Sequence, residues 1–294
     1  MIVDVHTHLP SHPDSVPASD EIAMSVHRSG TPVRFTQTVA EYLEAMEPVD
    51  KAFLFGIAPR PWAGDERRSR IAGWPADFNH NDVAAEVAKA APGKIIPFMS
   101  LHPLAADVND EYDRAVGDLG CRGIKMGANY QDFDPNGPEA YRLYARLEHD
   151  GIPIVWHMGT SPRADAPLEY AHPLAFDRVA SSFPRLKMIL AHMGHPWHVD
   201  ALSVVRKHPN VYADISAQFY RPWSFWNGLR LFHEWGVTDR IFFATDWPVA
   251  TPDENMSGIR NVCKFAVDHG LPEIPEQVIE EIINRDAAAI LGVD

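Results

Sequence analysis

The stretch M-I-V-D-V-H-T-H, residues 1–8, decides the fold. It opens with an apolar run that contains β-branched residues, which favours a buried strand. His6 and His8 stand two residues apart, and side chains at that spacing in a strand point to the same side. Two neutral imidazoles held in this way can bind one divalent metal ion. A His-x-His pair is common without a metal, so the interpretation depends on the rest of the chain.

Strand-like and helix-like segments alternate from one end of the chain to the other. Further short apolar runs predict strands at 49–55, 94–100, 121–126, 152–157, 186–192, 211–215 and 240–246. Apolar residues at helical spacing predict helices from Thr36 or Thr38 to Glu47 and at 81–91, 105–119, 138–150, 173–183, 197–207, 224–235 and 275–291. The last helix is expected to break near Asn284. Pro97 weakens the 94–100 prediction, because proline removes a donor from the strand ladder.

This alternation predicts a single (β/α)8 TIM barrel over residues 1–294. The strands are apolar on both faces, as parallel strands buried on both sides should be, and about eight strand–helix units match the barrel. A doubly wound open sheet is the alternative. No Gly-x-Gly-x-x-Gly follows the first strand, which disfavours a dinucleotide-binding version of that sheet.

Composition limits the classes of partner. The chain is 46% hydrophobic and 22% charged, with a formal net charge of −14. This balance is typical of a globular protein and disfavours nucleic acid or an anionic membrane as a partner. No apolar run approaches the roughly 20 residues that span a bilayer, and no leader sequence is expected. Cys121 and Cys263 are far apart and form no disulfide framework, so we expect a cytoplasmic protein.

The ends of the predicted strands carry most of the groups that could do chemistry. In a (β/α)8 barrel the active site lies at the carboxyl ends of the strands. Those ends hold His6, His8, His157, His192 and Asp246, with Lys125 near the end of the fourth strand. Three imidazoles and one carboxylate could hold a divalent ion and leave a position for water.

Five segments together resemble one enzyme family. They are V-D-V-H-T-H (3–8), V-W-H-M-G-T (155–160), I-L-A-H-M-G-H-P-W (189–197), V-Y-A-D-I-S (211–216) and F-F-A-T-D-W-P (242–248). In this order they resemble the amidohydrolase superfamily, and within it the amidohydrolase-2 group of aminocarboxymuconate-semialdehyde decarboxylase-like enzymes. The resemblance implies one divalent metal ion, Zn²⁺ with Mn²⁺ or Fe²⁺ as alternatives. It implies that the metal ligands are His6, His8, His157 and Asp246. It also implies that His192 is the acid/base group beside the metal-bound water.

Other residues near the strand ends leave alternatives open. Lys125 lies close to the position of a carboxylated lysine that bridges two metals in binuclear relatives. It could instead contact an anionic substrate or have a structural role. His195 is expected to be a loop or helix-start residue, and Asp214 a structural hydrogen-bonding residue.

Two loops predict the kind of substrate. The loop after the second strand holds Arg60 and Trp62 together with Arg67, Arg68, Arg70 and Trp74, and the loop after the seventh holds Tyr220 and Arg221 together with Phe219 and Trp223. Arginine binds carboxylates through paired hydrogen bonds, and aromatic walls suit a planar ligand. We therefore expect a small planar or aromatic anion bound by Arg60, Trp62, Tyr220 and Arg221, with Lys125 as a further contact. The alternative is that these side chains are solvated or pack the loops.

The sequence thus predicts a metal-dependent hydrolase of amide, lactone or ester bonds, in which His192 or Asp246 carries the proton to the leaving group. Non-oxidative decarboxylation of an aromatic or conjugated acid is the main alternative. A non-catalytic metal-binding barrel and a metal-free lactonase are the others. Related enzymes are often dimers, so a homodimer is expected.

Overall fold

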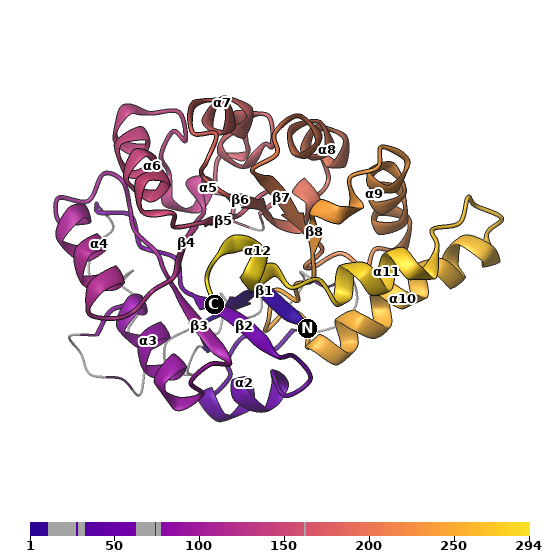
Figure 1. The fold of residues 1–294 in the computed structure, drawn as a ribbon, viewed down its shortest axis with the longest axis horizontal. Helices are drawn as coiled ribbons and strands as arrows, with labels where there is room; N and C mark the ends of the chain where they lie inside the picture. Colours follow the sequence, from indigo (N-terminus) through magenta and orange to yellow (C-terminus); the bar gives the residue numbers. More distant parts are fainter. Residues whose placement is uncertain (11–27, 29–32, 63–73, 75–77, 162) are drawn as a thin grey trace.

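The computed structural model describes residues 1–10, 28, 33–62, 74, 78–161 and 163–294. Its strands form one eight-stranded parallel sheet in which each strand pairs with the next along the chain (Figure 1). The strands are β1 (Val3–His8), β2 (Lys51–Phe55), β3 (Ile95–Met99), β4 (Gly123–Met126), β5 (Ile154–Trp156), β6 (Met188–Leu190), β7 (Val211–Asp214) and β8 (Ile241–Phe242). The predictions for Arg67, Arg68 and Arg70 lie outside the described residues.

The first and last strands come together and close the sheet. Thr7 forms a parallel bridge with Trp247, and the His8 N–H donates to the Trp247 carbonyl at 2.9 Å. The Asp246 N–H donates to the His6 carbonyl at 2.9 Å. The predicted (β/α)8 barrel is therefore confirmed, and the open-sheet alternative is wrong. Pro97 does lie within β3, where its carbonyl accepts the Arg122 N–H at 2.9 Å.

Helices surround the barrel (Figure 1). They are α2 (Val39–Ala45), α3 (His80–Ala90), α4 (Val108–Gly117), α5 (Ala128–Gln131), α6 (Pro138–Asp150), α7 (Ala175–Ser182), α8 (His198–Lys207), α9 (Pro222–Glu234), α10 (Pro252–Asp268), α11 (Glu276–Ile283) and α12 (Ala287–Leu291), with short 3₁₀ turns η3 (Leu168–Ala171), η4 (Ala191–Gly194) and η5 (Thr238–Arg240). The expected break near Asn284 separates α11 from α12.

Helix α10 was not predicted from the sequence, although its start signals are strong. Thr251 caps the helix in a reciprocal capping box with Glu254, and Pro252 occupies the first turn. This combination satisfies free N–H groups at a helix start and fixes the backbone there.

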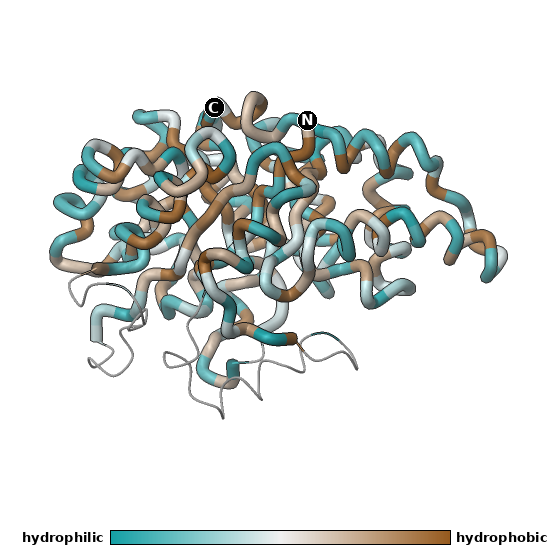
Figure 2. The backbone as a smooth tube through the Cα atoms, turned by 90° about the horizontal axis from the view of Figure 1, so that it is seen from below, coloured by the Kyte–Doolittle hydropathy of each residue, from teal (hydrophilic) through white to brown (hydrophobic). Residues whose placement is uncertain are grey.

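The barrel interior is a packed apolar core with one closed end. Side chains from the strands fill it, among them Val3, Val5, Phe53, Phe55, Phe98, Val155, Ile189 and Phe242. Phe98 fits because Gly123 has no side chain; a Cβ there would stand 2.0 Å from the Phe98 ring. Helix α12 joins this core through Ala287, Ala288 and Leu291. Figure 2 places both chain ends on one side of the molecule, so the carboxyl ends of the strands lie at the other end of the barrel.

A bulge in β1 turns the histidines into the barrel. Asp4 pairs with Ala52 and Thr7 with Leu54, so three steps along β1 match two along β2. The irregularity lies between Asp4 and Thr7. Within it, Val5 belongs to the interior core, and the next residue, His6, also faces the interior, with its ring 5.2 Å from that of Phe55. Such bulges occur beside active sites, where they change the direction of a side chain.

Within the described part of the chain, no helix combines the length and the apolar character needed to cross a membrane.

Candidate metal centre

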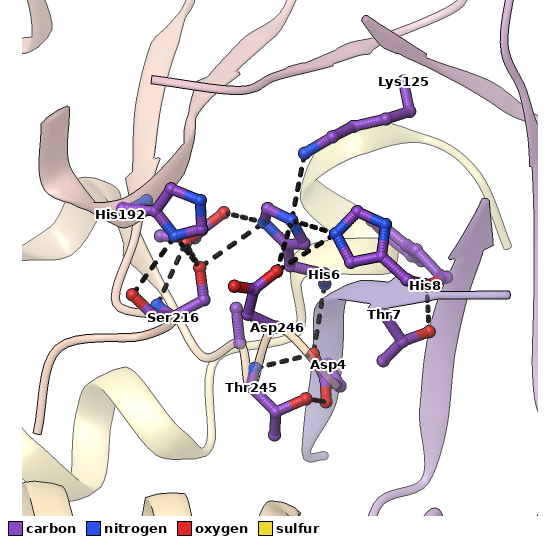
Figure 3. Close-up of polar contacts among 12 residues, drawn as sticks. Asp4, His6, Thr7, His8, Lys125, His192, Ser216, Thr245 and Asp246 are labelled. Atoms are coloured by element: carbon purple, nitrogen blue, oxygen red, sulfur yellow. Dashed lines mark hydrogen bonds and ion pairs between the residues drawn. The ribbon is translucent and has the colours of Figure 1, made fainter. Parts of the chain in front are cut away.

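Three donor atoms from β1 and the segment after β8 converge at the carboxyl end of the barrel (Figure 3). His6 Nε2 lies 3.3 Å from His8 Nε2 and 3.2 Å from Asp246 Oδ1, and His8 Nε2 lies 3.1 Å from Asp246 Oδ1. Tetrahedral Zn²⁺ with bonds of about 2.0–2.1 Å places its ligand atoms about 3.3 Å apart. The triangle therefore has the size that one such ion requires.

The tautomer of His6 suits a ligand. Its Nδ1 lies 3.0 Å from Asp214 Oδ2, and both side chains are buried. An ionised carboxylate can only accept, so Nδ1 carries the proton and Nε2 keeps the lone pair. This is the arrangement in which a carboxylate orients a metal-binding histidine. Asp214 thus has the hydrogen-bonding role expected of it.

His157 follows β5 and offers a further donor. Its Nε2 is buried and has no hydrogen-bond partner among the described residues. A buried polar atom without a partner is costly, and a bound cation would remove that cost. Burial holds the pKa of His157 well below its usual range, so the imidazole is neutral, the form that binds metals. The donor set and this unpartnered nitrogen both fit a divalent ion.

The other groups are also in ligand-competent states. Burial lowers the pKa of His8 to about 4. Burial raises the pKa of Asp246. The charge of His6 and the hydrogen bonds from His6 and His8 outweigh this effect and hold the pKa of Asp246 well below its usual range. Burial and Lys125 lower the pKa of His6, whereas Asp214 and Asp246 outweigh them and raise it. A cation at Nε2 would displace a proton from this imidazole.

His192 lies directly beside the triangle. It follows β6, and one of its ring nitrogens lies within 4.8 Å of the ligand atoms of His6 and Asp246. Burial lowers its pKa to about 4, so the imidazole is neutral at pH 7. Its backbone is left-handed, with φ 57°, and so are the backbones of Ala217 (φ 55°) and Asp246 (φ 62°). Such conformations are rare outside glycine and gather at functional sites.

A cavity of about 290 Å³ opens over these groups. Its polar lining comprises His8, Tyr130, His157, Thr160, His192, His195, Gln218, Tyr220, Arg221 and Asp246, and its apolar lining comprises Leu9, Phe35, Ile57, Met158, Ala217, Pro248 and Val249. The structure therefore brings together six of the residues singled out from the sequence: His8, His157, His192, Tyr220, Arg221 and Asp246.

Three other candidates lie elsewhere. The guanidinium of Arg60 is hydrogen-bonded within the protein. It donates to the Tyr130 carbonyl at 3.0 Å and to the Asp165 carbonyl at 2.8 Å. Trp62 is 55% exposed, and neither residue lines the cavity. Lys125 is fully buried behind it, with Nζ 3.0 Å from His6 Nε2. Burial lowers the pKa of Lys125 to about 8.

His195 and Tyr130 also line the cavity, although neither was predicted from the sequence as a site residue. His195 lies in the quoted H-M-G-H-P-W motif, so its nearness to a strand end was a usable signal. Burial lowers its pKa to about 4. Tyr130 follows the fourth strand inside the short helix α5, and nothing in its neighbourhood marked it. Its ring lies 4.4 Å from that of His157, and burial raises its pKa to about 12.

A closed (β/α)8 barrel with imidazoles and a carboxylate gathered at its carboxyl end has the architecture of a metal-dependent barrel enzyme. The chain belongs to the amidohydrolase family Amidohydro_2, whose family model matches residues 3–293. Fold, family and donor set together support a metal-dependent enzyme of this group.

Solved structures with the same fold include hydrolases and decarboxylases by name. The 5-carboxyvanillate decarboxylase LigW from Sphingomonas paucimobilis is 18% identical, with a TM-score of 0.66 over 100% of this chain and 99% of that chain. A dihydroxybenzoic acid decarboxylase from Polaromonas sp. JS666, with bound manganese, is 17% identical, with a TM-score of 0.65 over 99% and 96%. A probable 2-pyrone-4,6-dicarboxylic acid hydrolase from Acinetobacter baumannii, with citric acid bound, is 14% identical, with a TM-score of 0.64 over 99% of each chain.

Proposed function

We propose that this chain is a metal-dependent hydrolase that cleaves an amide, lactone or ester bond in a small, planar, anionic substrate. The observation that carries the proposal is the triangle of His6, His8 and Asp246 donor atoms, 3.1–3.3 Å apart, with neutral His192 beside it. His157 would complete the ligand set. When bound, a divalent ion lowers the pKa of water to about 7 and polarises a carbonyl group.

Zn²⁺ is the proposed ion, because nitrogen and carboxylate donors at tetrahedral spacing suit it. Mn²⁺ is the main alternative, since the Polaromonas decarboxylase structure holds manganese. Fe²⁺ accepts the same donors and stays in the test.

His192 and Asp246 are the groups available to move protons. His192 is neutral at pH 7 and lines the cavity, so it can accept a proton from the attacking water and return it to the leaving group. Asp246 is ionised and lines the same cavity, so its carboxylate is the second candidate for that transfer.

Tyr220, Arg221 and His195 form the proposed substrate-binding end of the cavity. The Arg221 guanidinium lies 4.6 Å from the centre of the Tyr220 ring, which holds a positive charge against an aromatic wall. Burial is the main cause of the lowered pKa of His195, and the positive charge of Arg221 is the next. Both residues line the cavity. A cavity of about 290 Å³ is at the small end of ligand sites, so a one-ring anion is the best match.

Decarboxylation of an aromatic acid is the second candidate function. Two of the three solved structures described above carry that activity in their names, and His192 would suit the handling of a proton at carbon. The substrate would be of the same class, a planar carboxylate, so the cavity favours neither reaction.

The decisive experiment follows carbon in the products. Protein loaded with Zn²⁺, Mn²⁺ or Fe²⁺ is incubated with aromatic carboxylates labelled at the carboxyl carbon, and in parallel with cyclic and aryl esters, lactones and amides. Release of a free acid without labelled CO₂ supports hydrolysis, whereas labelled CO₂ supports the decarboxylase. His192→Ala should abolish turnover while about one metal ion per chain remains. Turnover that survives this change would overturn the role of His192, and turnover that survives thorough chelation would support metal-free chemistry. Absence of both products across the panels would favour a non-catalytic barrel.

A further inference from the structure

We propose that Ser216 is a positioning residue that holds His192 in the tautomer with its proton on Nδ1 and links this tautomer, through Asp214, to the ligand His6. The proposal rests on the proposed acid/base role of His192 and adds a residue to which the sequence analysis gave no role.

Ser216 lies between the two imidazoles, directly after β7 (Figure 3). The residue is fully buried. Its Oγ lies 2.8 Å from His192 Nδ1 and 3.4 Å from His6 Nδ1, and it makes a short hydrogen bond to Asp214 Oδ1. The other oxygen of Asp214 accepts from His6 Nδ1. One carboxylate is thus in contact with His6 directly and with His192 through a hydroxyl group.

Counting protons fixes the direction of these bonds. A serine hydroxyl has one proton, and an ionised carboxylate only accepts, so Ser216 Oγ donates to Asp214. The contact with His192 must then be one in which Nδ1–H donates to Oγ. The Ser216 carbonyl oxygen, 3.3 Å from the same Nδ1, gives independent support, because a carbonyl also can only accept. His192 Nε2 therefore keeps its lone pair.

The free nitrogen is the one that the proposed reaction needs. Nε2 of His192 makes no hydrogen bond to any residue that the structure describes, while the ring lines the cavity. Protonation at Nε2 would leave the Nδ1–H bond to Ser216 in place. The positive charge formed on the ring would be stabilised by the negative charge of Asp214 across one hydroxyl group.

Backbone contacts support the same arrangement. Asp214 Oδ1 also accepts the N–H groups of His192 and Ser216, each at 3.0 Å. These bonds hold the left-handed backbone of His192, whose φ is 57°. A strained backbone persists only where its surroundings determine it, and here the determining group is the same carboxylate that orients the ring.

Nitrogen NMR of Zn²⁺-loaded protein with ¹⁵N-labelled histidine tests the assignment without any substrate. Loss of signals in His192→Ala identifies those of His192. We expect Nδ1 to be protonated and Nε2 to be unprotonated in the unchanged protein. In Ser216→Ala we expect part of the His192 population to move to the other tautomer, with zinc content unchanged. Ser100→Ala is the control, because Ser100 is also buried, and its Oγ accepts the Ala58 N–H at 2.8 Å after β3.

A proton on Nε2 in the unchanged protein would overturn the proposal, and this measurement decides even if Ser216→Ala does not fold. Identical His192 spectra for Ser216→Ala and the unchanged protein would also overturn it. Once a substrate is known, kcat of Ser216→Ala should fall about 10–100-fold, with KM within about twofold of the unchanged protein. A fully wrong tautomer would cost roughly 10⁴-fold. The expected loss is smaller because the backbone carbonyl of residue 216 still accepts from His192 Nδ1. Failure of every substrate would count against the proposed function and leave the tautomer result intact.

Discussion

His6 Nδ1 donates to Asp214 Oδ2 at 3.0 Å, and this bond directs the other nitrogen of His6 towards His8 and Asp246. In Asp214→Asn the new amide could donate to Nδ1, which would move the imidazole proton to Nε2 and block the lone pair. Changes to such orienting partners typically reduce metal affinity about 10–100-fold. We expect a loss of that size for Zn²⁺, measured by competition with a chromophoric chelator.

Asp177→Asn is the matched control for this change. Asp177 also binds a histidine, with His208 Nε2 at 2.7 Å, but its side chain is 36% exposed and lies on α7. The control should bind Zn²⁺ as the unchanged protein does. Equal affinity in Asp214→Asn and the control would mean that His6 is not a ligand through Nε2.

A second prediction concerns His157, whose Nε2 is buried without a partner among the described residues. Elemental analysis of freshly purified protein should give about one equivalent of divalent metal per chain, and His157→Ala should lose most of it. His149→Ala, which removes a side chain that is 87% exposed, should retain the metal. No metal in any of the three proteins would contradict the ligand assignment, and two equivalents would bring a carboxylated Lys125 into the ligand set.

Much of the site could be predicted because of the geometry of a parallel barrel. Every strand ends at the same rim, so His6, His157, His192 and Asp246 could be expected together once the alternation of strands and helices was recognised. The fold followed for the same reason, since strands that are apolar on both faces must be covered on both sides. These inferences need only periodicity and strand ends, which are local properties of the sequence.

The parts that could not be predicted depend on contacts between distant segments. Arg60 has the charge of a substrate-binding residue, but its guanidinium is bound to the carbonyls of Tyr130 and Asp165, which are 70 and 105 residues away. The bulge in β1 depends on the register with β2, which strand propensity does not encode. Ser216 acquires its role only because His192, 24 residues earlier in the chain and after β6, meets it from the neighbouring strand.

A third prediction uses Lys125, whose Nζ lies 3.0 Å from His6 Nε2. An ammonium group at that position competes with a cation for the same lone pair and repels it. We expect Lys125→Met to bind Zn²⁺ about tenfold more tightly, which corresponds to about 1.4 kcal/mol. The chelator competition measures this, with Lys264→Met, a change at a 71% exposed side chain, as the control. Weaker binding in Lys125→Met would indicate that the lysine is itself a ligand after carboxylation.

The last prediction concerns stability away from the site, where Arg114 joins α3 to α4. Its guanidinium lies 2.6 Å from Asp82 Oδ1 and 2.7 Å from Glu111 Oε2. Burial raises the pKa of both carboxyl groups, but hydrogen bonds from Arg114 outweigh it and leave each pKa below its ordinary value. The folded state therefore binds protons less tightly than the unfolded one, so this stabilisation is present above pH of about 4 and is lost as the pH falls through the lower folded values.

Arg114→Met should accordingly reduce the free energy of unfolding by about 1 kcal/mol at both pH 7 and pH 5, a modest loss because the Arg114 side chain is 35% exposed. Below pH of about 4 the difference from the unchanged protein should shrink. Thermal unfolding at these pH values measures it, and about 2–4 °C is expected for 1 kcal/mol in a chain of this size. Arg142→Met is the control, since Arg142 is 74% exposed and pairs with Glu139 at 3.4 Å. A difference that stays the same in acid would show that Arg114 stabilises the fold by packing and not through the two carboxylates.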